Sequence, residues 1–70
     1  MIYTIVKYHK TAEGGEATSA VRKEDMDAAI REYHQLATNY MADASVVEWS
    51  LSIVEPAEMK VKKRDHYVKA

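Results

Sequence analysis

The sequence predicts a small α+β domain in which two strands, one helix and two further strands follow one another along the chain. Three observations support this prediction. β-branched and aromatic residues fill the start of the chain, apolar residues recur at helical spacing in its middle, and a segment of alternating apolar and polar residues follows. A chain of 70 residues is of single-domain size, so we expect one domain over residues 1–70.

The first two strands are expected to form a hairpin. Met1 to His9 is the first strand, and its apolar side chains fall on both faces because side chains alternate across a strand. Lys10 to Glu16 contains both glycines of the chain and is expected to be the hairpin loop. A second, weaker strand is expected from Ala17 to Lys23.

The hydrophobic period then changes to that of an amphipathic helix from Met26 to Ala42. Asp25 is the expected N-cap, because its carboxylate can accept hydrogen bonds from free amides of the first turn. The apolar face of this helix comprises Met26, Ala29, Ile30, Tyr33, Leu36, Ala37, Tyr40 and Met41.

Ser45 to Glu55 has the most regular alternation in the chain and is expected to be a strand with one fully buried face. Pro56 lies in the turn that follows, and a last strand is expected from Met59 to Val68. The buried face of the third strand should hold Val47, Trp49, Leu51 and Ile53, with Val46 and Val54 on the opposite face.

The expected sheet is antiparallel with strand order 2-1-3-4. The most apolar strands, the first and the third, should be central, and the lysine-rich fourth strand should be an edge. One helix can cover only one face of this sheet. The expected helix–sheet core comprises Ile30, Tyr33, Leu36, Tyr40, Trp49, Leu51 and Ile53.

Composition excludes several classes of protein. The chain has no cysteine, which rules out disulfides and thiolate zinc sites, and its net charge of −1 gives no overall attraction to nucleic acid. It has neither a signal peptide nor an apolar run near the ~20 residues of a membrane span, so we expect a cytoplasmic protein with no membrane contact.

No motif of catalysis, cofactor binding or metal binding is present. His9, His34 and His66 lie in three separate elements without metal-ligand spacing. The serines lack a nucleophile elbow, and Gly14-Gly15 is not followed by the lysine of a P-loop. We therefore expect a protein that is not an enzyme and has no cofactor.

Two sets of residues are candidates for binding. Tyr3, Tyr8 and Tyr67 fall outside the expected core and could form a partner surface. Lys60, Lys62, Arg64 and His66 share one face of the last strand by period two, and the first three could contact phosphates. A solvated edge strand protected by charge is the favoured interpretation of this row.

One resemblance covers nearly the whole chain. The helix entry Lys23-Glu24-Asp25-Met26-Asp27-Ala28-Ala29-Ile30, the pair Tyr33-His34, and Met41-Ala42 before a valine-rich strand carry it. In these positions the chain resembles short uncharacterised proteins of bacteriophages, prophages and mobile elements of Gram-positive bacteria. It departs from them at Glu55-Pro56-Ala57-Glu58, where a glycine-containing turn is expected. The resemblance implies a biological context and no specific activity.

These observations favour a small non-enzymatic protein-interaction module of phage or mobile-element type, without a specific role, expected to be a homodimer paired through the uncovered sheet face or an edge strand. Two alternatives stay open. One is a nucleic-acid-binding accessory protein that uses the last strand, and the other is a phage-type inhibitor that docks on a host protein.

Overall fold

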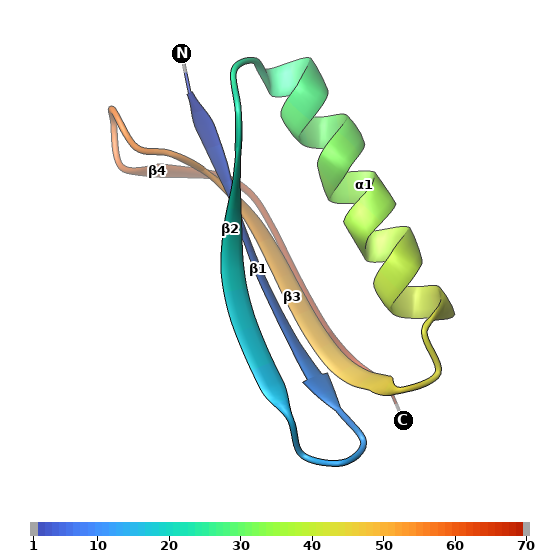
Figure 1. Ribbon diagram of the computed structural model, residues 1–70. Coiled ribbons are helices and arrows are strands. Elements are labelled where there is room, and N and C mark those ends of the chain that lie inside the picture. The colour runs from blue at the N-terminus through green and yellow to red at the C-terminus, as the bar shows by residue number, and fades with distance from the viewer. Residues whose placement is uncertain (1, 70) are drawn as a thin grey trace.

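A four-stranded antiparallel sheet with one helix across one of its faces makes up the fold (Figure 1). The computed structural model describes residues 2–69, so Met1, placed in the first strand from sequence, lies outside the described residues. The ββαββ order and the sheet order β2-β1-β3-β4 confirm the fold predicted from sequence. The elements are β1 (Tyr3–Thr11), β2 (Glu16–Lys23), α1 (Met26–Ala42), β3 (Val46–Glu55) and β4 (Lys60–Val68).

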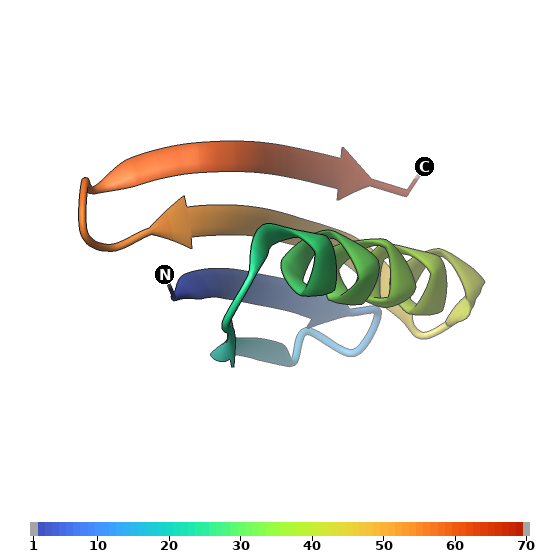
Figure 2. The same cartoon turned by 90° about the horizontal axis from the view of Figure 1, so that it is seen from above.

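The sheet register places the two apolar strands side by side at the centre. Ile5 of β1 lies opposite Val21 of β2 and Ile53 of β3. Figure 2 shows β2 and β4 at the two borders of the sheet. α1 packs on β3, β1 and β2, and within residues 2–69 it makes no comparable backbone approach to β4. We call the side of the sheet under α1 the covered face and the other side the open face.

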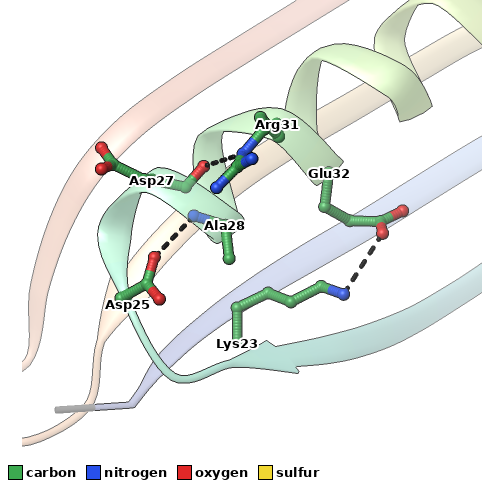
Figure 3. A network of polar contacts seen from close by, with 6 residues as sticks. All are labelled: Lys23, Asp25, Asp27, Ala28, Arg31 and Glu32. Carbon is green, nitrogen blue, oxygen red and sulfur yellow. Dashed lines mark hydrogen bonds and ion pairs between the residues drawn. The ribbon is translucent and has the colours of Figure 1, made fainter.

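The start of α1 is fixed by local contacts, of which the sequence predicted the N-cap (Figure 3). The Asp25 carboxylate accepts a hydrogen bond of 2.7 Å from the Ala28 backbone N–H, which confirms Asp25 as the N-cap. Lys23, at the end of β2, lies 3.5 Å from the Glu32 carboxylate and ties the strand to the second turn of the helix. These contacts set where the chain leaves the sheet and turns into the helix.

The core lies between α1 and the covered face. Tyr33, Leu51 and Ile53 are no more than 1% exposed, and Leu36 and Trp49 are also buried, which confirms most of the predicted core. Ile30 and Tyr40 pack against this cluster while staying partly exposed. The buried hydrophobic residues are Ile5, Ala29, Tyr33, Leu36, Val46, Trp49, Leu51 and Ile53.

The predicted position of Val46 is wrong. The sequence placed it opposite the Trp49 face, but Val46 is only 2% exposed and belongs to the core. The register between β1 and β3 shifts here, since Lys10 pairs with Glu48 whereas Thr11 pairs with Val46, and Val47 is the extra residue. Such a bulge reverses the side-chain alternation beyond it, and strict period-two counting misses this reversal.

Candidate interaction surface

The open face is the largest part of the described fold that no other element covers. Its residues are alternate positions of each strand, except at the register shift in β4, and the register sets them in rows across the sheet. By strand, they are Glu16, Thr18, Ala20 and Arg22; Thr4, Val6, Tyr8 and Lys10; Glu48, Ser50, Ser52 and Val54; and Val61, Arg64, His66 and Val68.

Small side chains occupy the centre of the open face. Val6 lies between Ala20 and Ser52, and the next row places Tyr8 beside Ser50. Val6, Tyr8, Ser50 and Ser52 are half-buried by their neighbours in the sheet. The serine hydroxyls can both donate and accept hydrogen bonds, and their small size lets a partner approach the backbone closely. The centre of the open face therefore presents partly accessible hydroxyl groups beside Val6.

Two cross-strand pairs order the end of this face that lies near the β1–β2 hairpin. The Tyr8 hydroxyl donates a 2.7 Å hydrogen bond to the Glu16 carboxylate, and this bond is the main cause that raises the pKa of Tyr8 to about 12. His66 Nε2 lies 2.7 Å from Glu48 Oε2. This end therefore presents a tyrosine and a histidine held by carboxylates.

The three tyrosines proposed as a partner surface do not lie together. Tyr8 lies on the open face, whereas Tyr3 shares the face of Ile5 and packs against the core. Tyr67 lies opposite Trp49 on the covered side, stacked on its ring at 6.1 Å and 44% exposed. Of this set, Tyr8 alone belongs to the candidate surface.

The basic row of β4 is also divided by the structure. A second register shift makes Lys62 the extra residue, because Ile53 pairs with Lys63 while Val54 pairs with Val61. Arg64 lies opposite Ser52 on the open face, but Lys60 lies opposite Glu55 on the covered side. The expectation that these side chains share one face is therefore wrong.

Lys62 has a specific partner that the sequence did not suggest. Its ammonium group lies 3.1 Å from Glu55 Oε2, and Glu55 is only 2% exposed. This contact raises the pKa of Lys62 above its ordinary value. Glu55 Oε1 is buried without a hydrogen-bond partner among the described residues. Glu55 continues the alternation of Trp49, Leu51 and Ile53, so the signal for its burial was present in the sequence.

An aromatic row crosses the covered side near the end of α1. The Tyr40 ring lies 5.3 Å from His9 and 6.0 Å from Trp49, and Tyr67 completes the row. Burial raises the pKa of Tyr40. The register of β1, β3 and β4 brings His9, Trp49 and Tyr67 into line. The sequence analysis treated His9 only as one of three separate histidines and did not predict this row.

The described residues offer no built site for a small ligand. Residues 2–69 enclose no detectable pocket and contain no cluster of three potential metal ligands. Within the same residues, no helix is long and apolar enough to cross a membrane.

Comparisons with protein-family models, curated proteins and solved structures gave no significant match.

Proposed function

We propose that this chain is a small non-enzymatic protein-interaction module of the cytoplasm that acts as a homodimer and binds a protein partner on its open face. The open face itself carries the proposal, because a whole side of a four-stranded sheet is left without a covering element. Its centre combines accessible hydroxyls with one aromatic ring, and its borders carry charge, an arrangement that resembles a protein interface with a polar rim.

The remaining hypotheses concern the partner. A phage-type inhibitor docking on a host protein would use the same open face, so this hypothesis specifies a class of partner and leaves the surface unchanged. The nucleic-acid hypothesis is less favoured. Lys62 is engaged by Glu55, and Lys60 and Arg64 lie on opposite sides of the sheet, so they form no continuous track along a phosphate backbone.

A pull-down with matched variants tests the proposal. Ser52→Lys places a charged, flexible side chain at the centre of the open face, whereas Thr38→Lys makes the same charge change on the exposed side of α1. Thr38→Lys should melt close to the wild-type temperature, since surface substitutions usually change stability by less than about 0.5 kcal/mol. Ser52→Lys sets a second positive charge opposite Arg64 and should melt somewhat lower, so circular dichroism first verifies that this variant is folded at the pull-down temperature.

We expect wild type and Thr38→Lys to retain the same protein from source-cell extract and Ser52→Lys to lose it. Nucleic acid in the eluate is measured in parallel. Retention of a protein that is unaffected by Ser52→Lys, or retention of nucleic acid alone, would contradict the proposal.

A further inference from the structure

The outer edge of β2 has unpaired backbone groups in a defined alternation. The Thr11 N–H donates to the Gly15 carbonyl at 2.8 Å, so at this end of the β1–β2 ladder the backbone groups of Thr11 and Gly15 face each other. Antiparallel pairs alternate along a ladder, and therefore every second residue of β2 turns its N–H and C=O away from β1. The outward-facing residues are Glu16, Thr18, Ala20 and Arg22.

The side chains of β2 leave this edge unprotected. From Glu16 to Ala20 all side chains are exposed, and the middle of the strand, Thr18-Ser19-Ala20, has neither the proline nor the lysine that edge strands use against pairing. A negative residue, Glu16, lies at one end and a positive residue, Arg22, at the other, both on the open face. Within residues 2–69, Arg22 has no ion-pair partner.

We propose that β2 pairs antiparallel with β2 of a second copy about a two-fold axis at Ser19. This inference rests on the proposed homodimer and specifies its surface. The pairing sets Glu16 opposite Arg22 of the second copy, twice by symmetry, and Thr18 opposite Ala20. Opposite charges directly across two strands stabilise their pairing. The two four-stranded sheets then become one continuous sheet.

The charge pattern also selects the register. Only outward-facing residues can pair with one another, so the next possible registers are shifted by two residues. One shift sets Glu16 opposite Ala20, and the other sets it opposite Glu24 of the second copy, where two carboxylates repel. The register centred on Ser19 is the one that matches both charged ends.

The other border of the sheet does not suit the same pairing. β4 carries Lys60, Lys62, Lys63 and Arg64 against the single acid Asp65, so a two-fold pairing of β4 brings together many like charges. Pairing through β2 also keeps both α1 helices on one side of the joined sheet. The two open faces then form one extended surface on the other side, which doubles the area proposed to bind the partner.

Reciprocal charge exchange tests the pairing. Glu16→Arg alone and Arg22→Glu alone each set like charges opposite one another, whereas the double variant restores opposite charges with their sign reversed. Sedimentation equilibrium over a roughly hundredfold concentration range measures the dimer dissociation constant. We expect each single variant to raise it about tenfold or more, and the double variant to return close to wild type.

Two controls separate this result from other causes. Glu13→Arg makes the same change of net charge in the exposed hairpin loop and should leave dimerisation unchanged. Glu16→Arg also removes the Tyr8 contact, but the double variant lacks that contact too, so its recovery reports the contact between copies. As a second measurement, Ala20→Pro removes an outward N–H while leaving the hydrogen bonds to β1, and should abolish the dimer with little change in circular dichroism.

The outcomes distinguish this inference from the proposed function. A dimer that resists the single charge variants and Ala20→Pro but dissociates in Ser52→Lys is formed by the open face, which overturns the β2 pairing and retains the homodimer. A single 8.0 kDa species at every concentration overturns both the pairing and the homodimer. Species that grow without limit indicate a head-to-tail contact and also overturn the two-fold pairing.

Discussion

The two faces of the sheet differ most clearly along β3, where the same strand serves both. Trp49, Leu51 and Ile53 point under α1 and are between 0% and 6% exposed, whereas Ser50 and Ser52, the residues between them, lie on the open face and are half-buried. Burial of large apolar side chains is the main stabilising contribution in a domain of this size. The covered face therefore holds the fold together, and the open face is free to carry binding groups.

Among single substitutions that compare the two faces, the largest expected change in the free energy of unfolding is at Leu51. Leu51→Ala should lower the free energy of unfolding by about 2–5 kcal/mol, because it leaves a cavity between α1 and the sheet. Ser50→Ala, its neighbour on the open face, should change it by less than about 0.5 kcal/mol. Urea denaturation measures both. Equal effects of the two substitutions would remove the distinction between the faces.

A smaller effect is expected at Tyr33, which links α1 to the border strand β4. Its hydroxyl donates to the Asp65 carboxylate at 2.5 Å and also lies 3.1 Å from the Leu51 carbonyl oxygen. Tyr33→Phe leaves both acceptors without this donor and should lower stability by about 1–3 kcal/mol. An unchanged melting temperature would show that the hydrogen bond between Tyr33 and Asp65 does not stabilise the fold.

The same tyrosine predicts a loss of stability in alkali. Burial, followed by the hydrogen bond to Asp65, raises the pKa of Tyr33 well above its ordinary 10.0, so the folded state holds the phenol proton more tightly than the unfolded state. This contribution is complete below pH 10.0 and is lost as the pH rises further. Urea titrations between about pH 9 and 11 should show a steeper decline for wild type than for Tyr33→Phe. Tyr8, Tyr40 and Lys62, whose pKa values are also raised, should leave a remaining slope in the variant.

Lys62 and Lys60 provide a comparison within β4. Lys62 pairs with the buried Glu55, whereas Lys60 pairs at 2.9 Å with the exposed Glu58. Lys62→Met leaves a buried carboxylate without its counter-ion, which lowers the stability of the folded state. Lys60→Met removes an exposed ion pair, which contributes little to stability. In thermal denaturation, the melting temperature of Lys62→Met should therefore be lower than that of Lys60→Met and that of wild type. The reverse order would show that Glu55 is accommodated without Lys62.

The smallest expected effect concerns nucleic acid. We expect the wild-type chain to bind DNA no more tightly than about 10⁻⁴ M at physiological salt, the range of nonspecific association. Substituting Lys60, Lys62 and Arg64 together by Ser removes three positive charges, so it should weaken this nonspecific association further. Fluorescence anisotropy with duplex and single-stranded DNA measures it. A nanomolar, salt-dependent complex that is lost in the triple variant would favour the nucleic-acid hypothesis.

Part of the candidate surface could be predicted from sequence. Period-two alternation separated Tyr8 from Ile5 within β1, and Ser50 and Ser52 from Trp49, Leu51 and Ile53 within β3, and the structure shows both separations. Alternation could not predict that Tyr8 lies on the open face while Tyr3 and Tyr67 lie on the covered face. The pattern of a single strand does not say which of its two faces the helix covers. The charges of Glu16 and Arg22 become candidates for contact with a second copy only because the sheet order places β2 at a border.

The order of the elements, the helix start at Asp25, the central positions of β1 and β3 and most of the core could all be predicted from the amino-acid pattern. These features follow from local chemistry: side-chain period, capping groups and the segregation of apolar residues. The position of Val46, the pairing of Lys62 with Glu55 and the separation of Lys60 from Arg64 follow only from the folded arrangement of the strands. Each depends on a register shift between two strands, and a register is fixed by contacts between distant residues that local periodicity does not contain.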